Sequence, residues 1–177
     1  MPGSTKDESK KPGENAALIT NPAHLTAESG EKLIPFLSYA KSNKNVVREF
    51  AARLKSTGWI DPWYDEEDIL PGQVWQDSVV HAVRHSHAVI IFLSKVAVAS
   101  EGFFQKELTL ALDTAAEKPE GTIFIIPIRL NDCDVPVRLQ QYQYVNYYGS
   151  DPHKEIVYVS LIAALRKRAE SLGIKII

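Results

Sequence analysis

A single carboxylate, Glu107, has the surroundings that chemistry would need. It lies in the stretch SEGFFQKELTLAL, residues 100–112, which has the apolar spacing of an amphipathic helix. Leu108 and Ala111 fall on the face that such a helix buries, and Glu107 lies at the border of that face with Phe103 one turn before it. The carboxylate is expected to look out past an aromatic ring, either as a reactive group or as an ordinary solvated glutamate.

Other polar residues are weaker candidates. His81 and His85 are four residues apart and could in principle bind zinc, but they lie off the apolar stripe of their helix and no HExxH arrangement accompanies them. Asp132 and Asp134 lack the further oxygen ligands of a calcium site. Ser94 has no histidine and aspartate at a spacing that would make it a hydrolase nucleophile. We therefore expect no metal centre.

The composition argues against several classes of protein. The 177-residue chain is 45% hydrophobic and 24% charged with a formal net charge of −2, so neither nucleic acid nor an anionic membrane should attract it. Its one cysteine, Cys133, cannot form an intramolecular disulfide, which suits a reducing compartment. The apolar runs HAVIIFLS and TIFIIPI are too short to cross a bilayer, and the first thirty residues hold no signal-peptide run. We expect a soluble, cytoplasmic protein.

The chain divides near residue 31. Residues 1–30 are rich in Pro, Gly, Ser and charge without a sustained period, which predicts a disordered tail or linker. Residues 31–177 form the predicted domain, in which apolar strands alternate with amphipathic helices, the pattern of a parallel sheet covered on both faces. The predicted strands are 33–39, 59–64, 87–94, 122–128 and 142–148, and the predicted helices are 42–57, 73–86, 103–117 and 153–171.

The carboxyl ends of these strands are where a doubly wound sheet binds its ligands. Ser38 and Tyr39 follow the first strand, Asp65 the second and Ser94 the third. A phosphoacceptor receiver domain would need acidic residues after the first strand and an aspartate at the end of the third, which this chain lacks. A dinucleotide-binding fold would need a glycine-rich turn after the first strand, and LSYAKSNKN contains no glycine.

Four segments in order carry a family resemblance. They are FLSYAKSNK, WYDEEDILPGQVWQDSV, AVIIFLSKVAVAS and GFFQKELTLAL. Together they resemble the TIR (Toll/interleukin-1 receptor) domain, in its NAD-hydrolysing bacterial branch, over the whole predicted domain. The resemblance implies a flavodoxin-like, doubly wound, five-stranded parallel sheet flanked by helices. It also implies cleavage of NAD⁺ between nicotinamide and ribose, with Glu107 as the catalytic carboxylate.

The chemistry of NAD⁺ cleavage agrees with a lone glutamate. Nicotinamide in NAD⁺ is already cationic and leaves as a neutral base, so no general acid is needed and one carboxylate can stabilise the oxocarbenium-like charge that grows on the ribose. Aromatic faces would hold the flat rings of the substrate. NAD⁺ is then the substrate and no cofactor is expected. The resemblance assigns the substrate-binding residues Ser38, Tyr39, Asp65, Trp75, Ser94 and Phe103.

The resemblance also implies self-association. DILPGQ looks like the BB loop of the family, with Asp68, Ile69, Leu70, Pro71 and Gly72 as oligomer contacts, and a head-to-tail contact of this kind can extend into filaments. The expected role is an effector of bacterial anti-phage immunity, giving ADP-ribose or a cyclic isomer and triggered by a separate sensor module or chain. The alternative is a non-catalytic adaptor that acts through TIR–TIR contacts. The segment GWIDPWYDEED is one residue longer than the usual run of the family at this place, and it contains Pro62. The second strand is therefore expected to be bulged or short.

Overall fold

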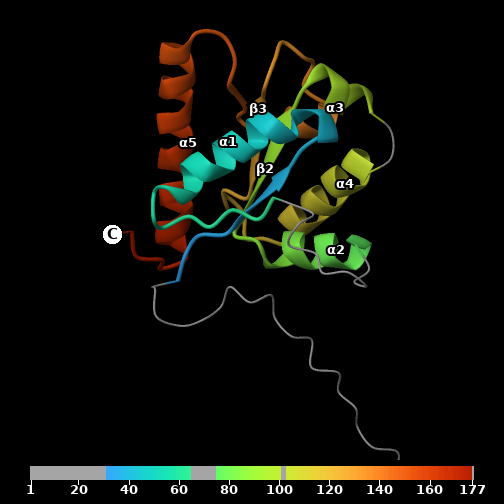
Figure 1. Cartoon of the computed structure of the whole chain (residues 1–177). Coiled ribbons are helices and arrows are strands. Elements are labelled where there is room, and N and C mark those ends of the chain that lie inside the picture. Colours follow the sequence, from blue (N-terminus) through green and yellow to red (C-terminus); the bar gives the residue numbers. More distant parts are fainter. Residues whose placement is uncertain (1–30, 65–74, 101–102, 177) are drawn as a thin grey trace, which may run out of the picture.

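The computed structural model describes residues 31–64, 75–100 and 103–176 (Figure 1). Each strand of its sheet pairs in parallel with the next, and all six residues of the central strand, AVIIFL, are buried. A strand buried on both faces is what a parallel sheet between two helical layers requires, so the predicted α/β fold is confirmed. In spatial order the strands are β1 (Pro35–Ser38), β2 (Ala88–Leu93), β3 (Ile125–Arg129) and β4 (Val145–Asn146).

The prediction of five strands was wrong by one within the described residues. Residues 59–63 run beside the free edge of β1 but form only two isolated parallel bridges, Leu33 to Ile60 and Phe36 to Trp63. The backbone bonds between these segments have one rung missing, because Pro35 has no N–H to donate to the carbonyl of Asp61. The expected short second strand is therefore reduced to bridges, while its place beside β1 keeps the doubly wound order.

Helices cover both faces of the sheet (Figure 1). The long helix α5 and α1 pack on one face, and α2, α3 and α4 pack on the other. The helices are α1 (Lys44–Lys55), α2 (Trp75–His85), α3 (Lys95–Ala99), α4 (Phe103–Ala116) and α5 (Asp151–Ser171), with short 3-10 helices at Lys41–Asn43 and Val137–Leu139. The five-residue α3 was not predicted, and α5 begins two residues earlier than expected.

Two cores result from the alternation of side chains along the strands. In β2, Ile90 and Phe92 enter the core beneath α1 and α5, whereas Ile91 and Leu93 enter the core beneath α2 and α4. The same alternation in β1 sends Leu37 to the first core and Phe36 to the second. Ser38, two residues after Phe36, therefore faces the α2 and α4 side at the end of the strand.

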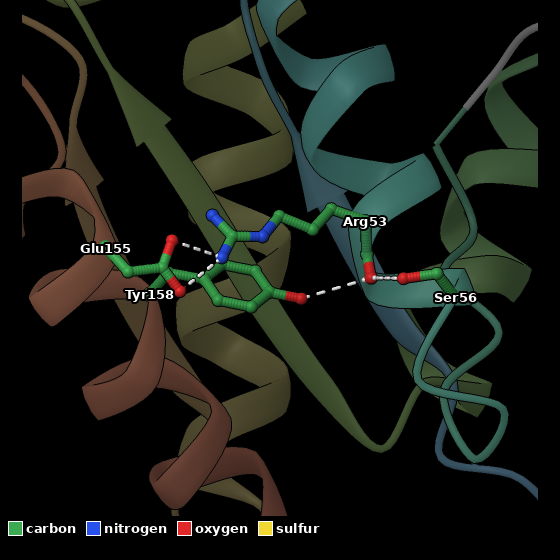
Figure 2. Close-up of polar contacts among 4 residues, drawn as sticks. All are labelled: Arg53, Ser56, Glu155 and Tyr158. Atoms are coloured by element: carbon green, nitrogen blue, oxygen red, sulfur yellow. Dashed lines mark hydrogen bonds and ion pairs between the residues drawn. The ribbon is translucent and has the colours of Figure 1, made fainter. Parts of the chain in front are cut away.

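A polar cluster joins α1 to α5 across the surface of the first core (Figure 2). The Arg53 guanidinium donates to Oε1 of Glu155 at 2.6 Å and also to Oε2, and its carbon lies 3.5 Å from the centre of the Tyr158 ring. The Tyr158 hydroxyl donates to the Arg53 carbonyl at 3.1 Å. Hydrogen bonding to Glu155 raises the pKa of Arg53. These contacts hold the two helices in one orientation.

Candidate functional site

Ser38 and Glu107 form a buried pair at the carboxyl end of β1. The Ser38 hydroxyl donates to Oε2 of Glu107 at 2.6 Å, although the two residues are 69 positions apart in the chain. Their residues are 1% and 7% exposed, respectively. A short O–H···O bond of this kind stabilises a carboxylate where little water reaches it. The structure thus brings the predicted catalytic residue and one predicted binding residue into direct contact.

Glu107 lies deeper than its sequence position suggested. The pattern placed it at the border of the helix stripe, but in α4 it is buried beside Leu108 and Ala111, which enter the core beneath α2 and α4. Burying a carboxyl group is unfavourable unless a donor compensates it, and Ser38 supplies one. The Glu107 carboxylate is therefore held in a fixed place at the sheet edge.

Tyr39 follows Ser38 but faces the other layer. Its ring packs partly buried against the core beneath α1 and α5, and its hydroxyl donates to the Tyr64 carbonyl at 2.8 Å. This bond ties the end of β1 to the end of the segment 59–64. The role of Tyr39 in binding a substrate remains a prediction.

Ser94 caps a helix. Its hydroxyl accepts the backbone N–H of Ala97 at 3.1 Å and donates to Oδ1 of Asn43 at 2.8 Å. These bonds explain why α3 begins directly after β2, because a serine at the N-cap satisfies an otherwise unpaired helix N–H. Ser94 lies at the carboxyl edge as predicted, with its hydroxyl engaged in holding α3 and the start of α1. Contact with a substrate remains a prediction for Ser94.

The remaining candidates can be placed only in part. Trp75 is the first residue of α2 and Phe103 is the first residue of α4, so both stand at helix starts. Their side chains lie outside what the structure describes, and so do Asp65 and the predicted BB-loop residues 68–72.

One aromatic residue on the α2 and α4 face of the sheet, Trp63, was not among the predicted site residues. The ring of Trp63 stacks on that of Phe36, with ring centres 5.2 Å apart and planes inclined by 17°. Phe36 precedes Ser38 by two residues on the same face of β1, so this indole lies on the face of the sheet that carries Glu107. The signal in the sequence is a tryptophan just before the carboxyl end of the predicted strand 59–64.

A shallow hollow on the solvent side of α4 is separate from the buried pair. Its volume is about 400 Å³, and its lining residues are Gln105, Lys106, Thr109, Leu110 and Asp113. Glu107 points to the opposite, buried side of the same helix.

Two features are absent from the residues that the structure describes. Among them, no three His, Cys, Asp or Glu side chains come together as metal ligands. None of the helices in these residues combines the length and the apolar character that crossing a membrane requires.

A family model described as the TIR domain matches residues 36–158, which span the sheet, the Ser38–Glu107 pair and the first part of α5. The chain belongs to the TIR domain family. No curated protein matches it significantly. The TIR assignment confirms the family given by the sequence motifs, while the NAD-hydrolysing branch remains a prediction.

Solved structures of several proteins are similar to this chain. The TIR domain of the Toll-related receptor TRR-2 from Hydra magnipapillata is 20% identical, with a TM-score of 0.61 over 75% of this chain and 97% of that chain. A prokaryotic SEFIR domain is 13% identical, with a TM-score of 0.53 over 76% of this chain and 99% of that chain. The TIR domains of the activated Roq1 resistosome match at 17% identity and a TM-score of 0.49, over 78% of this chain and 84% of that chain. At these identities the similarity concerns the fold alone.

Proposed function

We propose that this TIR domain cleaves NAD⁺ at the bond between nicotinamide and ribose, with Glu107 as the catalytic carboxylate. The observation that carries the proposal is the buried hydrogen bond from Ser38 to Glu107. A carboxylate fixed in a poorly solvated place interacts with a developing positive charge more strongly than one in water.

The reaction needs only this one ionised group. When the C1′–N bond breaks, its electron pair goes to the nicotinamide nitrogen and neutralises the pyridinium, while positive charge develops on the ribose. Glu107 stabilises that charge, and Ser38 keeps the carboxylate oriented. Water then adds to C1′ and releases a proton, which gives ADP-ribose; attack by a nitrogen of the adenine would give a cyclic isomer instead.

Substrate access supports a link between activity and assembly. Glu107 is only 7% exposed, and we propose that its surroundings rearrange when NAD⁺ binds. Head-to-tail contacts between copies could supply the energy for that movement and are the basis for proposing self-association, which can extend into filaments. The proposed setting is a cytoplasmic immune effector of a bacterium, which depletes NAD⁺ during phage infection after a sensor module or chain triggers assembly.

The test is nicotinamide release from NAD⁺ by the purified protein at high concentration, with a crowding agent to favour assembly. Glu107→Gln removes the charge at nearly constant volume. Glu155→Gln is the matched control, because it removes an exposed carboxylate of α5 on the other face of the sheet. We expect release by the wild type and by Glu155→Gln, and none by Glu107→Gln.

Light scattering on the same samples decides how a silent wild type is interpreted. If the wild type self-associates and still releases no nicotinamide, the catalytic proposal fails and a non-catalytic adaptor is the better description. If Glu107→Gln keeps full activity, a different group performs the chemistry.

A further inference from the structure

Two histidines lie side by side on the exposed surface of α2. His81 and His85 are separated by one helical turn, and their imidazole rings stack with centres 3.9 Å apart and planes inclined by 19°. Both residues are exposed to solvent. The backbone of α2 therefore keeps the two histidines one helical turn apart on the same side of the helix.

The hydrogen bond of His85 fixes where its proton sits. Nδ1 of His85 lies 2.8 Å from the carbonyl oxygen of His81. A carbonyl oxygen only accepts, so Nδ1 carries the hydrogen and the neutral ring has its lone pair on Nε2. Histidines that ligate metals are commonly oriented in this way, with the second ring nitrogen donating to a backbone carbonyl.

The chemistry of imidazole and the nearby charge are both compatible with a bound cation. Neutral imidazole is the form that binds a metal ion. Asp77, exposed and one turn before His81, adds negative charge to the same side of the helix.

We propose that His81 and His85 form a two-imidazole binding site for a divalent cation of the kind that prefers nitrogen ligands, such as Zn²⁺, Ni²⁺ or Cu²⁺. The exposed His81 ring turns about its side-chain torsions so that its lone pair and Nε2 of His85 converge on one ion. Among the described residues no group of three His, Cys, Asp or Glu side chains could hold a metal ion, so water fills the other positions and the affinity is modest. The bound ion joins two successive turns of α2 and stabilises the helix. This site does not depend on the proposed NAD⁺ cleavage.

Isothermal titration with Zn²⁺, on protein that carries no added histidine tag, tests the site. We expect one ion per chain in the wild type, and an affinity more than about tenfold lower in His81→Gln and in His85→Gln. The matched control is His153→Gln, which removes an exposed histidine of α5 whose Nε2 lies 3.0 Å from the Asn146 carbonyl. It should bind like the wild type. Zn²⁺ should raise the unfolding temperature of the wild type and of this control alone.

Circular dichroism establishes that each variant keeps its helix content before the titration. The proposal is overturned if folded wild-type protein binds no Zn²⁺, or if His81→Gln and His85→Gln bind it as tightly as the wild type. Loss of binding in His153→Gln would place the ion on α5 and would equally overturn it.

Discussion

Glu107 and Glu155 are carboxylates on helices that cover opposite faces of one sheet, and their surroundings differ in every respect that matters for chemistry. Glu155 is exposed and pairs with the guanidinium of Arg53, which itself stacks on Tyr158. Glu107 is buried and accepts a hydrogen bond from the neutral hydroxyl of Ser38. The first arrangement ties two helices together at the surface, whereas the second keeps a carboxylate at the strand ends where this fold binds ligands.

Under the proposed function, one side chain type serves structure in one place and chemistry in another. An exposed ion pair is screened by water and contributes little, whichever protein it belongs to. A carboxyl group can be buried only where hydrogen bonds offset the loss of hydration, and such buried carboxyl groups are candidates for functional sites.

The largest effect is expected on activity when the charge of Glu107 is removed. Glu107→Gln should lower the rate of NAD⁺ cleavage by about a thousandfold or more, because a positioned group that stabilises transition-state charge contributes on this order. Glu155→Gln should leave the rate within about twofold. Nicotinamide release followed by chromatography, at equal protein concentration and equal light scattering, measures both. An equal loss of cleavage rate in the two variants would contradict a special role for Glu107.

Ser38→Ala should reduce both activity and stability. Without the hydroxyl, the buried carboxylate loses a donor, which should lower the free energy of unfolding by about 1–3 kcal/mol. The carboxylate also loses its orientation, so cleavage should slow by up to about a hundredfold. Ser86→Ala is the matched control, since it removes another buried serine hydroxyl, which donates to the Val83 carbonyl at 2.8 Å. It should affect stability without affecting the rate per folded molecule, as measured by urea unfolding and nicotinamide release.

The periodicity of the sequence was sufficient to predict the layers but not the contacts between them. The continuous apolar run AVIIFL predicted a strand buried on both faces, and all six residues of β2 are buried. The backbone hydrogen bond missing at Pro35 depends on which edge of β1 its nitrogen faces. That edge is set by strand pairing and cannot be deduced from composition. A proline in a strand therefore predicts a missing backbone hydrogen bond, but not the edge of the strand on which the bond is missing.

The candidate site was predictable by position and not by geometry. Strand order placed Ser38 at the binding edge, and motif similarity selected Glu107, but their contact spans 69 positions and depends on how α4 is rotated. Ser94 is the opposite case. It was selected for its place at the strand end, and the structure shows that it caps α3, a helix too short to leave a periodic signal.

Acid should lower the free energy of unfolding through His87, which contacts α5. Its Nδ1 accepts the Ile34 N–H at 2.9 Å, and its carbonyl accepts from Arg168 of α5. Burial lowers the pKa of folded His87; the charge of Glu31 opposes this shift, and the charges of Arg168 and Lys118 add to it. An unfolded histidine has a pKa of about 6.5. The unfolded chain therefore binds the proton more readily. The contribution to stability is complete above about pH 6.5 and is lost as the pH falls from there through the lowered folded pKa.

Urea unfolding at several pH values between 5 and 8 measures this loss, with His87→Asn as the comparison because the amide oxygen takes the place of Nδ1 but does not titrate. The stability of His87→Asn should fall less steeply below pH 6.5. Identical slopes in the two proteins would assign the acid sensitivity to other groups.

The smallest effect is expected from the pair that looks strongest in the structure. Arg53 makes two hydrogen bonds to Glu155 and stacks on Tyr158, yet the Arg53 and Glu155 side chains are 36% and 56% exposed. Screening limits such an ion pair to about 0–1 kcal/mol, and an exposed cation–π contact adds about 0.5–1 kcal/mol. Arg53→Ala should therefore lower the free energy of unfolding by about 1 kcal/mol, and a double-mutant cycle with Glu155→Gln should return a coupling at or below that value. NAD⁺ cleavage by the folded variants should match the wild type. A coupling of several kcal/mol, or a loss of cleavage, would mean that the α1 and α5 face also shapes the site on the other side of the sheet.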